Sequence, residues 1–440
     1  MVSKFDELRQ KYDEIIYDGY SVNKNEESYK ITYNFVIPNL VTFNPTVSFS
    51  NSLFINKNIN EKLLDKIIYR LGLIELISYY KTVCPKKIVL NNGYISKEEE
   101  CFFKKIFYNG LGEFFYQNNI TISSDDLFIF EINGIEEEIG DIPFNGEGNL
   151  IPIGGGKDSC VSLELLKKED NKCFMINPKD VHFNCAEGFE SYTVKRTIDP
   201  KLIELNKQGF LNGHTPFSAI VAFSSYLIAY ITNRKNIILS NEGSANEPTV
   251  IGTNINHQYS KTYEFEIDFY DYTKNIFKID INYFSLLRPL KEVQIAYLFS
   301  KLNKYHNIFR SCNLGSKETP WVWCTKCPKC LFIFIMLRAF LKKEEVINIF
   351  GTNMLDDIEM KKYFLELIGE AETKPFECIG TIEEVKYALN KILDDDSYLV
   401  KLYKDNYYEN IDIDLSKLYY ENNVPSVHLE LLKEAINNAK

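Results

Sequence analysis

The chain has 440 residues, of which 45% are hydrophobic and 25% charged, as expected for a globular protein of two or three domains. Its formal net charge of −11 argues against a nucleic-acid partner, because binding a phosphate backbone needs a basic surface. No apolar run reaches membrane length, and the polar opening at 1–6 does not resemble a signal peptide. We therefore expect a cytoplasmic protein without a membrane partner.

The first 148 residues have the pattern of an α/β domain. Residues 28–55 alternate between apolar and polar side chains, as strands do, and apolar residues recur at helical spacing between 63 and 77. A short apolar run at 87–90 predicts another strand, and residues 97–118 predict a helical segment. The glycine-rich junction at 144–148 marks the expected end of this N-terminal domain, 1–148.

Short strand-like runs alternate with helical ones in the second expected domain, 149–311. Strands are predicted at 149–153, 172–176 and 236–240, and an apolar helix at 215–233. This βαβ order predicts an α/β fold with a doubly wound parallel sheet and right-handed crossovers. Because ligands bind such sheets beyond the carboxyl ends of the strands, the expected site includes 154–158 and 241–246.

The sequence Ile-Gly-Gly-Gly-Lys-Asp-Ser at 153–159 joins the first of these strands to a helix. Glycines let a ligand approach the backbone closely, and the N–H groups and dipole of a helix N-terminus favour an anion. A Walker A loop is excluded because Ile151 stands at its first glycine position, and Ser159 stands at the last glycine position of a dinucleotide fingerprint. A glycine turn without a ligand is the remaining structural alternative.

The turn resembles the PP-loop of ATP pyrophosphatases, Ser-Gly-Gly-x-Asp-Ser, with Gly154 in place of the first serine. The resemblance implies a sheet of the adenine-nucleotide alpha hydrolase (PP-loop) type, with ATP and Mg²⁺ as ligands. The glycines and Ser159 would hold the β- and γ-phosphates, Lys157 would offset their charge, and Asp158 would hold Mg²⁺. The residues expected to bind ATP are Gly154, Gly155, Gly156, Lys157, Asp158, Ser159, Asn241, Glu242 and Ser244.

Four of the ten cysteines follow the pattern Cys312-x11-Cys324-x2-Cys327-x2-Cys330. Without an export signal, cysteines are reduced thiols or metal ligands rather than disulfides. Four thiolates at these spacings suit tetrahedral Zn²⁺, and because all four positions are protein ligands, the metal would be structural. We therefore predict a four-cysteine zinc module within a mainly helical C-terminal region, 312–440. An iron–sulfur cluster and unliganded thiols are the alternatives.

Together, the PP-loop and the Cys-x2-Cys-x2-Cys cluster resemble 7-cyano-7-deazaguanine synthase, but over these two motifs only. A second family, the UDP-N-acetyl-alpha-D-muramoyl-L-alanyl-L-glutamate epimerases, resembles the chain from about residue 60 to the C-terminus. The motifs that carry this resemblance are Gly-Leu-Gly-Glu-Phe-Phe-Tyr at 110–116, Asn-Gly-His-Thr-Pro at 212–216, Ser-Asn-Glu-Gly-Ser-Ala-Asn-Glu at 240–247, Asn-His-Gln-Tyr-Ser-Lys-Thr-Tyr-Glu-Phe-Glu at 256–266, Leu-Arg-Pro-Leu at 287–290, Phe-Arg-Ser-Cys-Asn at 309–313 and Lys-Pro-Phe-Glu-Cys at 374–378.

The epimerase resemblance implies an isomerase of peptidoglycan precursor synthesis. The terminal L-Glu of UDP-N-acetylmuramoyl-L-alanyl-L-glutamate would become D-Glu, with ATP and Mg²⁺ consumed and AMP and diphosphate released. Adenylation removes the negative charge of a carboxylate, so the resulting acyl-adenylate allows an adjacent carbanion to form. The alternatives are a deazaguanine synthase-like ligase and a zinc-organised ATP-binding protein without turnover.

The same resemblance supplies candidates for catalysis and for binding the UDP-muramoyl dipeptide. The catalytic candidates are His257, Lys261, Cys378 and Asp158, and the substrate-binding candidates are His214, Tyr259, Glu264, Arg288 and Arg310. Structural alternatives stay open for most of them. The alternation at 261–269 suits a β-strand with a solvated face, in which case His257 is a surface histidine. His214 could cap the following helix, the two arginines could pair with structural acids, and Cys378 could be a packing group.

Overall fold

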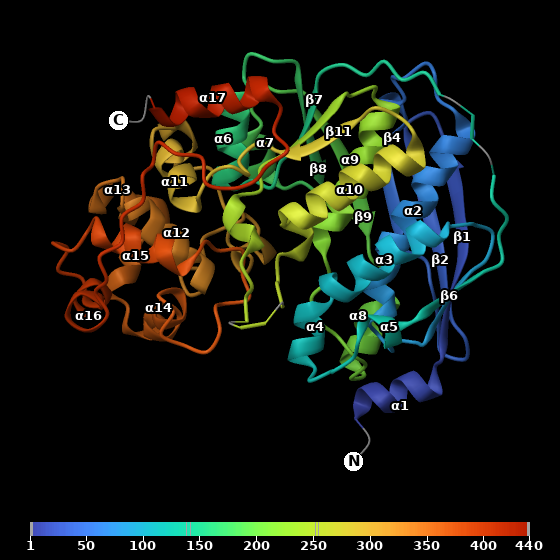
Figure 1. The fold of residues 1–440 in the computed structure, drawn as a ribbon, viewed down its shortest axis with the longest axis horizontal. Coiled ribbons are helices and arrows are strands. Elements are labelled where there is room, and N and C mark those ends of the chain that lie inside the picture. Colours follow the sequence, from blue (N-terminus) through green and yellow to red (C-terminus); the bar gives the residue numbers. More distant parts are fainter. Residues whose placement is uncertain (1–2, 138, 141, 251, 254, 438–440) are drawn as a thin grey trace. The chain divides into compact units, whose positions relative to one another are not determined.

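The computed structural model describes residues 3–137, 139–140, 142–250, 252–253 and 255–437 (Figure 1). It contains two compact units, each assembled from three stretches of chain. Unit 1 comprises Met1–Leu150, Tyr192–Ile237 and Ile267–Tyr283, and unit 2 comprises Ile151–Ser191, Ile238–Glu266 and Phe284–Lys440. The consecutive domains 1–148, 149–311 and 312–440 remain a prediction from the sequence.

Unit 1 is a mixed α/β structure. Its elements are α1 (Lys4–Lys11), β1 (Glu14–Lys24), β2 (Ser28–Ile37), β3 (Val41–Phe43), β4 (Thr46–Ser50), α2 (Glu61–Tyr80), β5 (Lys87–Leu90), α3 (Lys97–Gly110), α4 (Gly112–Gln117), α5 (Ser124–Leu127), β6 (Ile129–Ile132), β9 (Ser191–Thr197), α8 (Pro200–Lys207) and α9 (Phe217–Ile231). The first residue of β9 belongs to unit 2, and four further elements have residues in both units, namely β7 (Asn149–Pro152), β10 (Asn236–Leu239), α10 (Tyr263–Phe277) and β11 (Asn282–Ser285).

The strands of unit 1 are ordered β9-β4-β2-β1-β5-β6. The pairs β1/β2, β2/β4 and β4/β9 are antiparallel, whereas β1/β5 and β5/β6 are parallel. The alternation predicted for 28–55 is confirmed in β2, where every second residue from Tyr29 to Ile37 is buried. The parallel sheet expected for 149–311 is therefore only part of the arrangement, because β9 pairs antiparallel with a strand from the N-terminal segment.

Long-range pairing explains why the sequence did not predict this antiparallel block. Thr46 pairs with Thr197 and Phe49 with Val194, which lie more than 140 positions apart in the sequence. The local pattern of such a strand shows which residues can be buried, but it does not show which strand is the partner. The buried helices α2 and α9 pack against each other in this unit, and both were predicted from their apolar content.

Unit 2 contains the nucleotide-loop candidate and the helical C-terminal region. Its elements are α6 (Lys157–Leu165), β8 (Asn171–Ile176), α7 (Asp180–Cys185), α11 (Glu292–Ser300), α12 (Pro328–Arg338), α13 (Lys343–Phe350), α14 (Lys361–Leu367), α15 (Ile382–Asn390), α16 (Tyr398–Asn406) and α17 (Ser426–Asn437). In the sheet, the strands β11, β10, β7 and β8 are neighbours in this order. Because β7 and β10 are parallel, the loops after them leave the same edge of the sheet.

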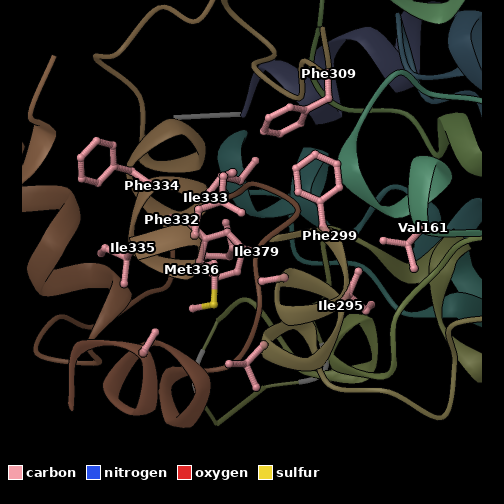
Figure 2. Packing of buried hydrophobic residues seen from close by; sticks show 14 of the residues in the cluster. Val161, Ile295, Phe299, Phe309, Phe332, Ile333, Phe334, Ile335, Met336 and Ile379 are labelled. Atoms are coloured by element: carbon pink, nitrogen blue, oxygen red, sulfur yellow. The ribbon is translucent and has the colours of Figure 1, made fainter. Parts of the chain in front are cut away.

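The core of unit 2 centres on α12, whose residues 330–337 are all buried. A helix that is apolar on every side belongs inside a core rather than at a surface. Figure 2 shows its side chains packed with Ile295 and Phe299 of α11, with Phe309, and with Ile379. Among the described residues, no helix is both long and apolar enough to cross a membrane.

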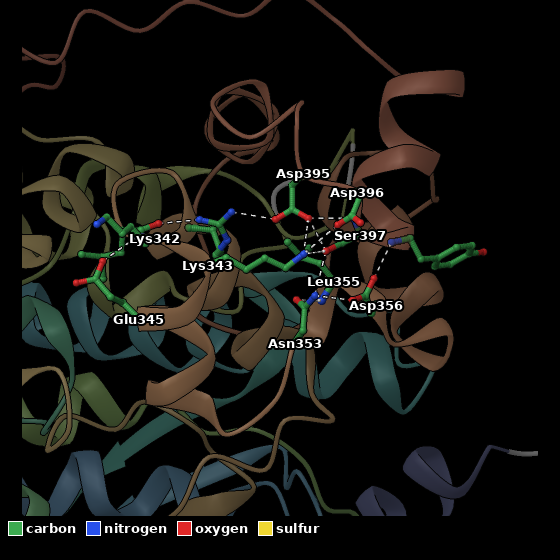
Figure 3. A network of polar contacts seen from close by, with 12 residues as sticks. Lys342, Lys343, Glu345, Asn353, Leu355, Asp356, Asp395, Asp396 and Ser397 are labelled. Atoms are coloured by element: carbon green, nitrogen blue, oxygen red, sulfur yellow. Dashed lines mark hydrogen bonds and ion pairs between the residues drawn. The ribbon is translucent and has the colours of Figure 1, made fainter.

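A buried carboxylate ties the helices that follow α12 to one another (Figure 3). Asp395 accepts hydrogen bonds from Arg338 Nη2 and Lys343 Nζ, each at 2.9 Å, and from the hydroxyl of Ser397 at 2.5 Å. Burial raises the pKa of Asp395, but these three donors outweigh it and hold the pKa well below its usual range. The charged network thereby fixes the end of α12, the start of α13 and the start of α16.

Candidate functional site

The turn between β7 and the start of α6 contains three consecutive glycines, Gly154–Gly156. Gly155 has φ +76°, in the left-handed region that glycine adopts without strain, and a Cβ at Gly156 would lie 2.7 Å from Ser311 Oγ. A Cβ at Gly154 would meet no heavy atom within 4 Å. The predicted strand–turn–helix is therefore confirmed as local structure, and it leaves space at its first glycine.

Lys157 begins α6 and turns its ammonium group into the protein. Its side chain is 2% exposed, and Nζ lies 2.7 Å from Glu292 Oε1 and also pairs with Asp158. Burial lowers the pKa of Lys157, but the charges of Asp158 and Glu292 outweigh burial and raise it above its ordinary value. In this state the ammonium neutralises carboxylates of the protein itself.

Three carboxylates meet beside this lysine. One oxygen each from Asp158, Glu242 and Glu292 lies within 4.8 Å of the others, and the latter two residues are buried. Burial raises the pKa of Glu292, as do the charges of Asp158 and Glu242, while Lys157 opposes the shift. Glu292 Oε2 and the buried hydroxyl of Ser244 have no hydrogen-bond partner among the described residues. The three carboxylates form a site that could hold a metal ion.

Glu292 is the member of this cluster that the sequence analysis missed. It is the first residue of α11 and follows the predicted Leu-Arg-Pro-Leu landmark at 287–290 by two positions. Its only local signal was an acidic residue in the first turn of a helix, which is common on protein surfaces. The neighbouring Asn241 is partly exposed in the loop after β10.

Arg288 pairs with a structural acid, Glu266, which is one of the alternatives left open by the sequence. It is fully buried, and its Nη2 lies 2.9 Å from Glu266 Oε2. Nη1 donates to the main-chain oxygen of Glu242 at 2.7 Å, and Nη2 donates to that of Lys261 at 2.6 Å. Arg288 therefore holds the backbone of one carboxylate residue and of one catalytic candidate.

Two catalytic candidates, His257 and Lys261, lie beside a third, the thiol of Cys378. The segment carrying Cys378 contacts Thr249, because Lys374 N donates to Thr249 O at 3.2 Å. Thr249 Oγ1 in turn accepts from His257 N at 3.1 Å. The side chains of His257 and Lys261 both lie close enough to the thiol of Cys378 to lower its pKa.

Cationic neighbours make Cys378 unusually acidic. Burial raises the pKa of this thiol, but the charges of Lys261 and Lys329 and the hydrogen bond from His257 outweigh burial and hold it well below its usual value. Cys378 is partly exposed, so the resulting thiolate remains within reach of a ligand. Thiolates are both nucleophiles and bases, and a lowered pKa keeps them ionised near neutral pH.

Two lysines, Lys261 and Lys329, interact electrostatically with Cys378. Burial lowers the pKa of Lys261, but Cys378, Glu242 and Asp158 outweigh it, so the pKa is raised. Lys261 thus lies within electrostatic range of both the thiol and the carboxylate cluster. Lys329 stands in the sequence as a spacer between Cys327 and Cys330, so its position beside the thiol was not predicted.

Two other substrate candidates lie near this region of the chain. Tyr259 is buried, with its ring edge-on to Phe265 at a centroid distance of 5.9 Å. Glu264 is exposed in the first turn of the helix α10. Because residues from Tyr263 onward are helical, the strand alternative for 261–269 is wrong. A helix forms there because Thr262 O accepts from Glu266 N and Thr262 Oγ1 accepts from Phe265 N, which starts the helical bonding.

The remaining two candidates have protein partners of their own. Arg310 N donates to Gly155 O at 2.8 Å, and its guanidinium donates to Phe309 O at 2.7 Å. His214 belongs to unit 1, where Nδ1 lies 3.5 Å from Glu113 Oε2. The N-cap of α9 is Pro216, so His214 does not occupy the capping position that the sequence left open.

The four predicted cysteine ligands form a compact cluster. Cys312 and Cys327 have sulfurs 3.9 Å apart, and those of Cys324 and Cys330 are 3.8 Å apart. All four sulfurs lie within 4.8 Å of one another. Tetrahedral ligands at a Zn–S distance of ~2.3 Å have sulfurs ~3.8 Å apart, so this spacing fits a metal ion of that size.

Main-chain donors surround the sulfurs as well. Gly315 N lies 3.1 Å from Cys312 Sγ, and Cys330 N lies 3.4 Å from Cys327 Sγ. Such donors stabilise thiolates, which are the metal-binding form of cysteine. Cys327 is also the N-cap of α12, so the cluster is built on the N-terminus of the core helix.

Comparison with known proteins assigns the family. The family model described as the MurL N-terminal domain matches residues 6–286. The chain belongs to the MurL family. The MurL C-terminal domain matches residues 308–411, which include the cysteine cluster and Cys378. The resemblance to this epimerase family is thereby confirmed.

Three relatives of this MurL family member bear one name, UDP-N-acetyl-alpha-D-muramoyl-L-alanyl-L-glutamate epimerase. The protein of Xanthomonas oryzae pv. oryzae is 34% identical over 356 residues, covering 78% of both chains. That of Micromonospora sp. is 33% identical over 349 residues, covering 76% of both. That of Salinispora tropica is 34% identical over 335 residues, covering 74% of this chain and 73% of the relative.

Proposed function

We propose that the protein is the epimerase its relatives are named for. It converts the terminal L-Glu of UDP-N-acetylmuramoyl-L-alanyl-L-glutamate to D-Glu, a step in the supply of peptidoglycan precursors. The observation that carries the proposal is that three relatives named for this reaction are 33–34% identical over about three quarters of the chain. In the site, Lys261 lies within electrostatic range of both the Cys378 thiol and the carboxylates beside the glycine turn. Activation of a carboxylate and removal of a nearby proton need these two sites close together.

ATP would activate the glutamate carboxylate. The α-proton of a glutamate residue is weakly acidic, because the carbanion would form beside a carboxylate that already carries negative charge. Transfer of AMP to that carboxylate, with loss of diphosphate, gives an acyl-adenylate in which the carboxyl group no longer carries a charge. The fold in this proposal is of the PP-loop type, and the phosphates lie on the turn at Gly154–Gly156, where glycines and the start of α6 favour an anion.

Mg²⁺ suits the three-carboxylate site, because it prefers oxygen ligands and bridges protein to phosphates. Asp158, Glu242 and Glu292 would hold it, and it would neutralise charge on the phosphates as diphosphate leaves. Lys157 would exchange its carboxylate partners for phosphate oxygens. Ser244 and Asn241 would complete the nucleotide contacts, since the Ser244 hydroxyl is buried and lacks a hydrogen-bond partner in the described structure.

Proton transfer falls to the cluster around Cys378. Its thiolate removes the α-proton of the adenylated glutamate, and an acid on the opposite face returns one. Lys261 and His257 stabilise the thiolate on the face from which the proton leaves, so the returning proton comes from another group, on the opposite face. Water then releases AMP and the D-glutamyl product. Tyr259, Glu264, Arg310 and His214 remain predicted substrate contacts.

Zn²⁺ is the metal that best fits the four cysteines. The sulfur spacing and the donors to sulfur agree with a closed, four-thiolate site, whose role is structural. The thiolates would hold the ion, and the ion would fix the loop from Cys312 to Cys330 and the start of α12.

One experiment tests the reaction as a whole. The protein is mixed in D₂O with ATP, Mg²⁺ and the UDP-muramoyl dipeptide, and deuterium at the terminal α-carbon is measured together with AMP. We expect both signals to depend on ATP, and the product to contain D-Glu. Deuterium exchange at full rate without ATP would refute the adenylate step. AMP formation without exchange or inversion would refute epimerisation.

A further inference from the structure

A pocket of about 330 Å³ lies beside the glycine turn in unit 2. It is formed by the start of α7, by residues 307–310 and by residues 318–321 of the cysteine module. Two of its lining residues contact the turn itself. Arg310 N donates to Gly155 O, and Val181 Cγ1 lies 2.9 Å from the position a Cβ would take on Gly155.

The walls of this pocket suit a flat, heteroaromatic group. Trp321, Pro320, Ile308 and Val181 supply apolar surface. Among the polar groups, the amide of Asn184 can both donate and accept hydrogen bonds, as a nucleobase edge requires. Indole rings stack on every base, because each base presents a π-face.

The cysteine module sets the position of the indole. Trp321 Nε1 donates to Cys312 O at 2.9 Å, so the ring is anchored to a metal-ligand candidate. On the α7 side, Lys179 Nζ binds the main-chain oxygens of Ser316 and Glu318, the latter at 3.2 Å. These contacts close the pocket between α7 and the module.

We propose that this pocket holds the base and sugar of a nucleotide, with the base stacked on Trp321 and the phosphates directed to the glycine turn. The volume is at the lower end of the ~300–1,000 Å³ of small-molecule sites, which suits a nucleoside rather than the entire muramoyl dipeptide. The nucleotide is either ATP or the UDP part of the substrate. The inference rests on the proposed function only in requiring a nucleotide at the turn.

Trp321→Ala and Trp321→Phe form a matched pair for the test. Titration calorimetry measures binding of ATP–Mg²⁺ and, separately, of UDP to each variant. We expect Trp321→Ala to weaken one of the two nucleotides by about tenfold or more, and Trp321→Phe, which keeps a ring, to weaken it less than about threefold. Loss of ATP binding identifies the base as adenine, and loss of UDP binding identifies it as uracil.

Several outcomes overturn the proposal. Unchanged affinity for both nucleotides in Trp321→Ala does so, as does equal weakening in both variants, because the indole N–H rather than stacking would then matter. If Trp321→Ala loses its metal or unfolds, Asn184→Trp replaces it, since this change fills the pocket from α7. Wild-type nucleotide affinity in that variant also overturns the proposal. Failed proton exchange with normal nucleotide binding would refute the proposed reaction alone.

Discussion

Replacing Arg288 by leucine should destabilise unit 2 strongly. The guanidinium is fully buried and pairs with Glu266, whose side chain is 2% exposed, at 2.9 Å. Breaking a buried ion pair by removing one partner costs about 3–5 kcal/mol, because the other charge stays buried. The main-chain oxygens of Glu242 and Lys261 also lose their donors, which places the expected loss at the upper end of that range.

Tryptophan fluorescence measures this loss directly. The two tryptophans of the chain, Trp321 and Trp323, both belong to unit 2. Their emission during unfolding by the denaturant guanidinium chloride therefore reports on that unit. The double variant Arg288→Leu/Glu266→Leu is the control. It should recover part of the lost stability, because no charge remains buried without a partner.

The opposite result would refute this reasoning. If Arg288→Leu unfolds at the wild-type denaturant concentration but shows a raised KM for the dipeptide, Arg288 is a substrate ligand. The sequence-based prediction would then hold, and the contacts to Glu266 would be incidental. A loss of stability without recovery in the double variant would assign the effect to packing rather than to charge.

Four further variants test the site. Cys378→Ala should lower α-proton exchange by about 10²–10⁴ while substrate-dependent AMP formation persists, and full exchange in this variant would exclude the thiol as base. Lys261→Met should move the acidic limb of the exchange rate to higher pH, because removing the cation raises the pKa of Cys378 and a base must be deprotonated; an unmoved limb would contradict this. Glu292→Gln should raise the Mg²⁺ concentration for half-maximal AMP formation at least about tenfold, whereas an unchanged requirement would remove Glu292 from the metal site. Cys327→Ala should lose about one equivalent of zinc by metal analysis and lower the unfolding midpoint, and a metal-replete, equally stable variant would refute the structural role.

Local patterns allowed the loop and the cysteine cluster to be predicted. The turn at 153–159 and the Cys312–Cys330 spacing each lie within a short stretch, so backbone geometry alone brings their groups together. For the same reason both ends of α9, Phe217–Ile231, lie within two residues of the helix expected at 215–233.

Groups from distant segments could not be predicted in the same way. Glu292 reaches Asp158 from a helix more than 130 positions later, and Lys329 reaches Cys378 from inside a motif assigned to metal binding. The sequence at 261–269 alternates, but its burial follows a helix because the hydrogen bonds of Thr262 start one. Propensity and alternation are weak guides where tertiary contacts decide.

The charge around Lys157 has a consequence for the order in which ligands enter. Asp158 and Glu292 share the ammonium of Lys157, and Glu242 lies beside them. A bare triphosphate would add several more negative charges, and two like charges 4 Å apart repel by about 4 kcal/mol at an effective dielectric constant of 20. Under the proposed function, the carboxylates would repel free ATP, whereas its Mg²⁺ chelate would carry less negative charge and a cation for the carboxylates to hold. We therefore expect the acidic residues to favour the Mg²⁺ chelate of ATP over the free nucleotide, whatever contacts the base makes.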